Sequence, residues 1–297
     1  MLGFRKAERT LALPDPAELT QAIAEVARDL CMDTQSIKRS LPDVAADVMS
    51  LCQQASTDAL RIEKSVTRDP FISAQIVSVA NSPMFAPRMP IVSVRDAIVR
   101  IGLSNVSDIV MMVVTSSTMF RIRGFDAHVG RVTSRFPATA LAARLIASTL
   151  HLPMESAFTA GLLHDIGDLI LLDGCVKSGK VRPEMIQEPV FYGVIMDALH
   201  ANHTKVGAAV CTVWKLPAST VEAASHHHDY KLGGHHFSAN LVAAADAFAD
   251  NMGVGVENKR VLDPAEAVFK DLGLKAEQVT STLVQFGKLL PSVRIFK

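Results

Sequence analysis

The segment from Ala157 to Leu172 holds the pair of residues in this 297-residue chain that is best suited to chemistry. Read as one continuous helix, it gathers Gly161, His164, Asp165 and Asp168 on one side and apolar side chains on the other. The adjacent imidazole and carboxylate offer a nitrogen and an oxygen ligand, which together suit a divalent metal ion. A buried histidine held by an aspartate for purely structural reasons gives the same pattern, and the residues alone favour that interpretation.

Glycine occupies positions 161 and 167 of the same segment, inside the predicted helix. A glycine in a helix interior costs about 1 kcal/mol relative to alanine. Gly161 and Gly167 therefore predict that a neighbouring element approaches the backbone closely at these two points.

Histidine is concentrated in one later region, since seven of the ten histidines lie between His200 and His236. Any single member of the run His226 to His228 is best explained as a helix cap or a solvated turn. Taken together with His164, Asp165 and Asp246, however, these histidines form a set that could converge on one site.

The composition favours packed helices and restricts the class of function. Hydrophobic residues make up 49% of the chain and aromatic residues only 5%, a mixture typical of helical proteins. Thirty basic and thirty acidic side chains cancel, so no overall field attracts nucleic acid or anionic lipid. The longest apolar run is far shorter than the roughly 20 residues of a membrane span. Four scattered cysteines without paired spacing fit free thiols, and we expect a cytoplasmic protein.

Helix signals recur along the chain, and no segment alternates with period two for long enough to predict a sheet. We therefore expect an all-α fold with no sheet of more than two short strands. Asp69 and Pro70 predict the capped start of a buried helix. Residues 33–36 have the composition of a linker. Two separate helices are predicted between residues 192 and 213, and a long one from about 132 to 150.

Four arginines, at positions 121, 123, 131 and 135, lie in a stretch with only Asp126 to oppose them. Aromatic residues that would stack on bases are missing between them, so the nucleic-acid signal is weak. A solvated helix face explains Arg121, Arg123 and Arg131 better, whereas Arg135 is a special case that depends on a family resemblance.

The sequence resembles the HD phosphohydrolase superfamily and, within it, the regulatory HDOD domains of bacterial signalling proteins. The segment Gly161-Leu-Leu-His-Asp-Ile-Gly167 is similar to the superfamily signature. Other matching motifs stand in the family's order, namely Leu41-Pro42, Arg68-Asp-Pro70, Ala80-Asn-Ser82, Ala97 to Gly102, His203-x-x-x-Gly207, Trp214-x-Leu-Pro217 and His226 to His228.

The resemblance implies an all-helical, multi-helix HDOD fold over residues 36–250. It divides this domain into an N-terminal helical half, about 36–125, and an HD-like half, about 126–250. Residues 1–35 then form a leader and a first helix, and residues 251–297 form a C-terminal helical tail.

The resemblance also implies a degenerate site. An active HD site contains a first histidine, a His-Asp pair and a distal aspartate. Here His164 and Asp165 correspond to the pair and Asp246 to the distal aspartate, while the first histidine has no match. Alignment places Arg135 where the first histidine belongs. His128 lies seven residues earlier, roughly 10 Å along a helix, and does not replace it. The pocket implied by the resemblance consists of Arg135, His164, Asp165, His203, His227 and Asp246.

Two further features of active relatives are missing. The extended Gly-Tyr-Pro motif of the cyclic-dinucleotide phosphodiesterases does not follow His226 to Asp229, and Asp168 stands where many relatives carry a lysine. The chain is thus expected to be a non-catalytic regulatory protein of a bacterium, with a protein partner and no bound metal or other cofactor. One alternative is a phosphohydrolase whose His164, Asp165 and Asp246 hold Mn, Mg or Fe; its wider site would include His203 and His227. Another is a nucleotide sensor that uses the same pocket.

Arg135 leads to two opposed hypotheses. If it points into the pocket, its permanently charged guanidinium faces Asp165 and Asp246 and supplies the positive charge that a metal would bring. If it lies on a solvated face, the two acids need another partner.

Overall fold

The computed structural model describes residues 14–85, 87–117, 120–256 and 258–293, which form helices and no strand, as the sequence predicted. The N-terminal helices are α1 Pro16–Met32, α2 Thr34–Ser40, α3 Asp43–Cys52, α4 Ala59–Val66, α5 Pro70–Ala80, α6 Val94–Ile101 and α7 Leu103–Ser117. The middle of the chain forms α8 Asp126–Thr149, α9 Met154–Leu163, α10 Ile166–Lys177, the 3-10 helix η1 Pro183–Gln187, α11 Pro189–Val213, α12 Ala218–His226 and α13 Phe237–Asn251. The C-terminal helices are α14 Ala267–Lys270 and α15 Ala276–Val293.

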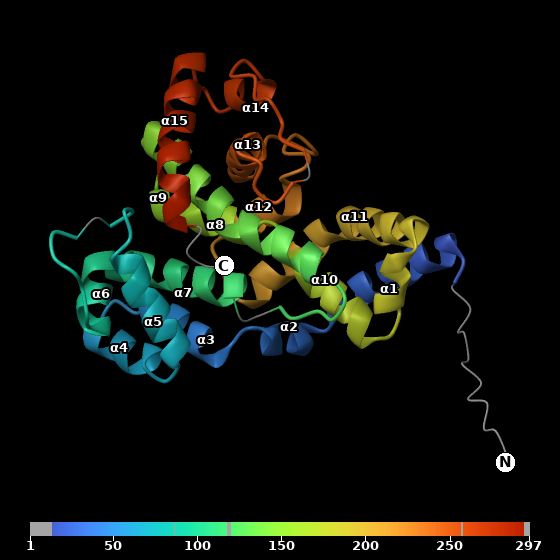
Figure 1. Ribbon diagram of the computed structural model, residues 1–297, viewed down its shortest axis with the longest axis horizontal. Helices are drawn as coiled ribbons and strands as arrows, with labels where there is room; N and C mark the ends of the chain where they lie inside the picture. Colours follow the sequence, from blue (N-terminus) through green and yellow to red (C-terminus); the bar gives the residue numbers. More distant parts are fainter. Residues whose placement is uncertain (1–13, 86, 118–119, 257, 294–297) are drawn as a thin grey trace, which may run out of the picture.

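Helix α8 is the element on which the others are assembled. It packs against α7 from the N-terminal half, α9 and α13 from the HD-like half and α15 from the tail. Figure 1 shows α3 to α7 on one side of the molecule and α13 to α15 on another. Helix α1, which the sequence assigned to a separate N-terminal segment, packs against α10 and α11 of the HD-like half.

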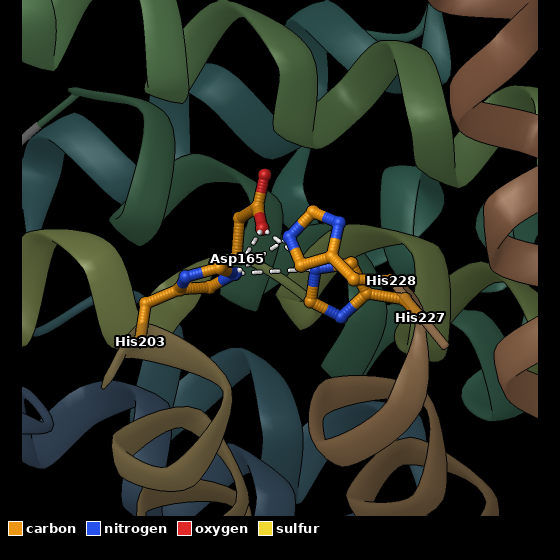
Figure 2. Close-up of side chains that lie close together, drawn as sticks. All are labelled: Asp165, His203, His227 and His228. Carbon is orange, nitrogen blue, oxygen red and sulfur yellow. Dashed lines mark hydrogen bonds and ion pairs between the residues drawn. The ribbon is translucent and has the colours of Figure 1, made fainter. Parts of the chain in front are cut away.

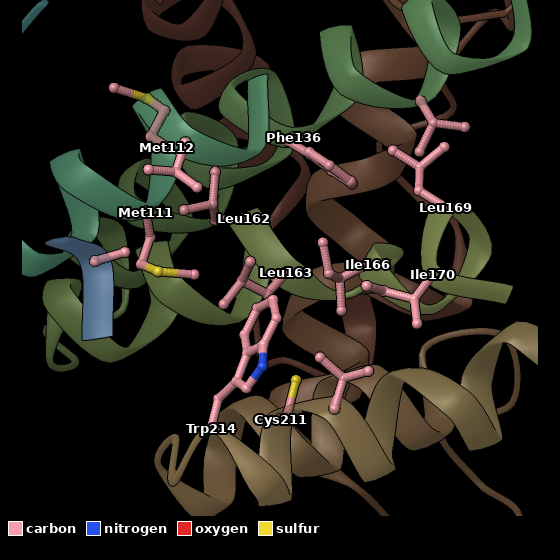
Figure 3. Packing of buried hydrophobic residues seen from close by; sticks show 14 of the residues in the cluster. Met111, Met112, Phe136, Leu162, Leu163, Ile166, Leu169, Ile170, Cys211 and Trp214 are labelled. Atoms are coloured by element: carbon pink, nitrogen blue, oxygen red, sulfur yellow. The ribbon is translucent and has the colours of Figure 1, made fainter. Parts of the chain in front are cut away.

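The main core joins the two halves. Met111 of α7, Phe136 of α8 and Leu162 of α9 are buried together with Trp214, which follows α11 (Figure 3). The Trp214 indole N–H donates a hydrogen bond of 3.2 Å to the carbonyl oxygen of Ile37 in α2. The indole thus has the partner that a buried Trp requires. Thr159 Oγ1 of α9 also donates a buried hydrogen bond to Asp108 of α7, so the two halves share apolar surface and buried polar contacts.

A second core lies between α8, α13 and the tail. The ring of Phe248 in α13 lies 5.8 Å from that of Phe269 in α14 and 6.0 Å from that of Phe286 in α15, centroid to centroid. Alanines of α8 and α13 allow the helix backbones to come close there. Within the described ranges no single helix is long and apolar enough for a membrane span; the bent pair Val94–Ile101 and Asn105–Thr115 meets those criteria only jointly.

Two predicted boundaries are wrong. The supposed linker at 33–36 begins α2, because an Asp33 carboxylate oxygen accepts the amide hydrogens of Gln35 and Ser36 at 3.1 and 3.0 Å. An N-terminal cap of this kind starts a helix in a polar sequence. The two helices expected between 192 and 213 are one, α11, since Pro189 lies at its N-terminus and no proline interrupts it before Val213.

The cap predicted at Asp69 is present. Its Oδ1 accepts the amide hydrogens of Phe71 and Ile72 at 2.8 and 3.1 Å, and Pro70 occupies the first helical position. The complete burial predicted for α5 is wrong, however, because Phe71 is 41% exposed while Ile72 and other residues of one face are buried. The helix packs against α6 and α7 and leaves its opposite face open.

Replacing Asp69 with alanine should lower the free energy of unfolding by about 1 kcal/mol, since two amide groups lose their acceptor. Asp69→Asn is the matched control, because asparagine caps equally well, and it should restore nearly all of that loss. Urea denaturation followed by circular dichroism measures both. Equal loss in the two variants would show that the carboxylate charge, rather than the cap, is what stabilises α5.

Candidate functional site

The His-Asp pair lies at a break between two helices, and the single helix predicted over 157–172 is wrong. Helix α9 ends at Leu163 and α10 begins at Ile166, so that His164 and Asp165 form the corner. The His164 Nδ1 atom lies 2.9 Å from the carbonyl oxygen of Gly161, which it satisfies as a donor. The corner aims both side chains inward, where a straight helix would separate them by about 100°.

The two glycines allow this corner to pack, as the sequence predicted. A Cβ atom on Gly161 would lie 2.7 Å from the carbonyl oxygen of Thr139 in α8. A Cβ atom on Gly167 would overlap the carbonyl oxygen of His203 and the amide nitrogen of Gly207 in α11. Helices α8 and α11 thus reach the corner backbone to backbone, and α11 brings His203 with it.

Asp165 is the centre of the site. Its Oδ2 lies 3.1 Å from His164 Nε2, and its Oδ1 lies 3.4 Å from His203 Nε2 and 3.1 Å from His227 Nε2. Figure 2 shows the side chains of Asp165, His203, His227 and His228 directed at one another, from the corner, from α11 and from the end of α12. His203 Nε2 is 3.3 Å from His227 Nε2 and 3.1 Å from His228 Nε2.

The side chains of this group differ in how readily they ionise. Burial opposes ionisation of Asp165, but the neighbouring His164 and hydrogen bonds from His203 and His227 hold its carboxyl pKa well below its usual range. Burial also disfavours the imidazolium of His164, yet Asp165 outweighs this and raises the His164 pKa to about 9. Burial and the adjacent rings lower the pKa of His228 to about 3. Asp165 therefore favours the imidazolium of His164; burial also opposes ionisation of His203, but Asp165 raises the His203 pKa, whereas His228 stays neutral.

Arg135 lies at the other end of the site, only 11% exposed. Its Nη2 is 2.5 Å from Asp246 Oδ2 and its Nη1 is 2.6 Å from Asp250 Oδ1. Nη1 also donates to the carbonyl oxygen of Val254 at 3.2 Å. The guanidinium thus bridges α8, α13 and the start of the tail. The second acid paired with Arg135 is Asp250, where the sequence suggested Asp165.

The remaining residues of the sequence-based site fall close by. Asp246 Oδ1 lies 3.6 Å from His164 Nε2 and accepts a hydrogen bond of 3.0 Å from Thr139 Oγ1. His128, excluded as a replacement for the first histidine, lies in α8 with its Nε2 2.6 Å from Asp168 Oδ1. Asp168 and His128 therefore satisfy each other beside the pocket.

Two residues of this group, His228 and Asp250, were absent from the pocket predicted from the sequence. Both had a signal: His228 belongs to the triple histidine, and Asp250 follows Asp246 by four residues, which places both on one helix face. The three consecutive histidines do not all face the site. The His226 ring stacks on that of His236 with centroids 3.8 Å apart. His227 and His228 turn toward His203 instead.

The residues that fit a metal ion form a group of four. Asp165, His203, His227 and His228 each offer one ligand atom, and these atoms all lie within 4.8 Å of one another. Three imidazoles and a carboxylate are a ligand set typical of Zn²⁺ and of Fe²⁺. This set shares only Asp165 with the one implied by resemblance, which was His164, Asp165 and Asp246.

Comparison with known proteins places the sequence in a family. The sequence model of the HDOD domain matches residues 39–230. No curated protein matches the sequence significantly. Among solved structures, an HDOD domain protein of unknown function from Geobacter sulfurreducens superposes with a TM-score of 0.65 at 18% identity, over 86% of this chain and 92% of that chain.

Two other solved structures share the fold. A candidate metal-dependent phosphohydrolase from Shewanella amazonensis has a TM-score of 0.60 at 20% identity, covering 90% of this chain and 99% of that one. A candidate signal transduction protein from Marinobacter aquaeolei has a TM-score of 0.63 at 21% identity, covering 94% of this chain and 67% of that one. At such identities the likeness establishes the fold, while the activities in the names belong to those proteins.

Proposed function

Because the chain belongs to the HDOD domain family, we propose that it is a non-catalytic signalling protein that binds a protein partner or a small ligand in a bacterial cytoplasm. The observation that carries this proposal is the position of Arg135, bound to Asp246 and Asp250. Guanidinium does not lose its proton at physiological pH, so the Asp246 carboxylate has a permanent counter-charge. A hydrolase of the HD type needs that distal aspartate as a metal ligand.

The ion pairs of Arg135 also suit a rigid domain whose surface is recognised by a binding partner. The guanidinium fork joins α8 to α13 and reaches the Val254 carbonyl oxygen, which ties the tail to the pocket. His128 and Asp168 connect α8 to α10 in a similar way. These two contacts of one long helix hold the HD-like helices in fixed relative positions, which suits a binding scaffold.

A hydrolysis assay tests the absence of catalysis. We expect purified protein with Mn²⁺, Mg²⁺ or Fe²⁺ to release no p-nitrophenol above background from p-nitrophenyl phosphate or its bis-ester. Cyclic dinucleotides should likewise remain intact. Metal-dependent turnover in the wild type that Asp165→Asn abolishes would overturn the proposal, because the activity would then belong to this pocket.

The second candidate is a metal-dependent phosphohydrolase, and the four converging ligands favour it. A metal ion held by Asp165, His203, His227 and His228 would supply an activated water and a clamp for phosphate oxygens. The residues around it leave such an enzyme without the first histidine and with the distal aspartate engaged by Arg135. The assay above decides between the two candidates, and a thermal-shift screen with nucleotides shows whether the small ligand is a nucleotide.

A further inference from the structure

Three imidazoles in the pocket turn ring nitrogens toward the same point. His203 Nδ1 lies 2.8 Å from the carbonyl oxygen of His200, and His227 Nδ1 lies 3.0 Å from that of Ala223. A carbonyl oxygen only accepts hydrogen bonds, so both Nδ1 atoms carry hydrogen. In a neutral imidazole the Nε2 atom is then a bare lone pair, and this atom of both rings faces inward.

These two Nε2 atoms lie close to one another and to a carboxylate. His203 Nε2 lies 3.3 Å from His227 Nε2, and Asp165 Oδ1 lies 3.4 and 3.1 Å from the same two atoms. An Nε2 atom can donate to Asp165 only when its ring carries a second proton; without that proton these are contacts between buried acceptors, which repel each other. A single proton would satisfy one of the contacts and leave the others as they are. A cation shared by all of them satisfies the whole group.

The spacing of the four ligand atoms fits a small tetrahedral ion. Bonds of about 2.0–2.1 Å, as for nitrogen or oxygen on Zn²⁺, place the corners of a tetrahedron roughly 3.3 Å apart. Four of the six separations lie between 3.1 and 3.4 Å, and all six are within 4.8 Å. The hydrogen bonds from Nδ1 to backbone carbonyls are the contacts that orient histidine ligands in metal sites.

We propose that Asp165, His203, His227 and His228 bind one transition metal ion of the Zn²⁺ class, and that Arg135 takes the place of a second ion. The positions that would hold the second ion are next to His164 and Asp246, where the guanidinium already binds Asp246 and Asp250. A permanent cation there repels another dication and occupies its carboxylate ligand. The inference uses the same four ligands as the second candidate function, but it concerns a resident ion and requires neither turnover nor a signalling partner.

The ion would act on the fold as well as on the pocket. His203 lies in the middle of α11, whereas His227 caps the C-terminus of α12 and His228 follows it. One ion bound to all three, and to Asp165 at the corner before α10, joins three helices at a single point. Loss of the ion should therefore loosen the segment after α12, which contains Gly233 and Gly234 with positive φ angles.

Metal analysis of purified protein tests the proposal. After stripping with a chelator and titration with Zn²⁺, the wild type should bind one equivalent and melt at a higher temperature. Substitution with Co²⁺ should give the intense visible absorption of a four-coordinate site. His228→Ala should weaken Zn²⁺ binding by more than about 100-fold. Mutations of residues that only orient a ligand weaken metal binding by up to about 100-fold, and loss of a ligand should cost more. His203→Ala should do the same.

His235→Ala is the matched control, since His235 is exposed and hydrogen-bonded to Asn240 outside the group. It should bind one equivalent with unchanged affinity.

Arg135→His should bind a second equivalent, because the new imidazole can join His164 and Asp246. A wild type that binds no stoichiometric metal, or a His228→Ala variant that binds like His235→Ala, would overturn the proposed site. Two equivalents in the wild type would overturn the role of Arg135. Turnover by the one-ion protein would defeat the non-catalytic function and leave this inference intact.

Discussion

Replacing Arg135 with methionine should lower the free energy of unfolding by about 3 kcal/mol or more. The side chain is 11% exposed and forms ion pairs with both Asp246 and Asp250, which are themselves 22% and 26% exposed. Methionine keeps most of the apolar volume but leaves two largely buried carboxylates without a counter-charge. Urea denaturation in the presence of a chelator, which gives all variants the same metal-free reference, measures the loss.

Neutralising the two acids in the same protein is the rescue experiment. The triple variant Arg135→Met, Asp246→Asn, Asp250→Asn removes the uncompensated charge, and asparagine oxygen still accepts the hydrogen bond from Thr139 Oγ1. We expect it to recover more than half of the lost stability, because the contributions of contacting residues are coupled. Arg135→Lys should lose an intermediate amount, since an ammonium group lacks the planar fork. If Arg135→Met came within about 0.5 kcal/mol of the wild type, a range typical of ordinary surface changes, the buried ion pairs would contribute little.

Replacing Gly167 with alanine should cost about 3 kcal/mol, although alanine is the better helix former. The added methyl group would overlap the His203 carbonyl oxygen and the Gly207 amide nitrogen, which are backbone atoms and have no rotamer through which to move away. Helices α10 and α11 must then separate, and His203 moves away from Asp165. The loss should be visible both in urea denaturation and as weaker Zn²⁺ binding.

Gly193→Ala is the matched control. Gly193 is also inside a helix, α11, but a Cβ atom there meets nothing within 4 Å. This substitution should raise the free energy of unfolding by up to about 1 kcal/mol, because alanine restricts the unfolded chain and favours the helix. Equal effects at positions 167 and 193 would mean that α10 and α11 are not in backbone contact.

The sequence was sufficient for the all-α class, for many of the helix starts and for the family, because these depend on local signals. Asp69 with Pro70 begins a helix through contacts within four residues, and those contacts do not depend on the rest of the chain. Gly161 and Gly167 indicated close packing because a glycine inside a helix is unfavourable without such a reason. Local signals also misled where a cap was overlooked, as at Asp33, which starts α2 in a polar stretch.

The geometry of the site was decided by tertiary packing. The apolar residues of 157–172 permit one straight helix, and the close approach of α8 and α11 accompanies a corner at His164 and Asp165 instead. Arg135 could have faced solvent or the pocket. Its direction follows from the packing of α8 on α13, which brings Asp246 and Asp250 to the guanidinium.

The three consecutive histidines show the limit of the sequence most directly. Successive residues at a helix end point about 100° apart, so a run of identical side chains carries no information on which of them face a neighbour. The sequence established that His226, His227 and His228 were available near the end of a helix. The position of α12 against α11 then directed His227 and His228 toward His203, and left His226 stacked on His236.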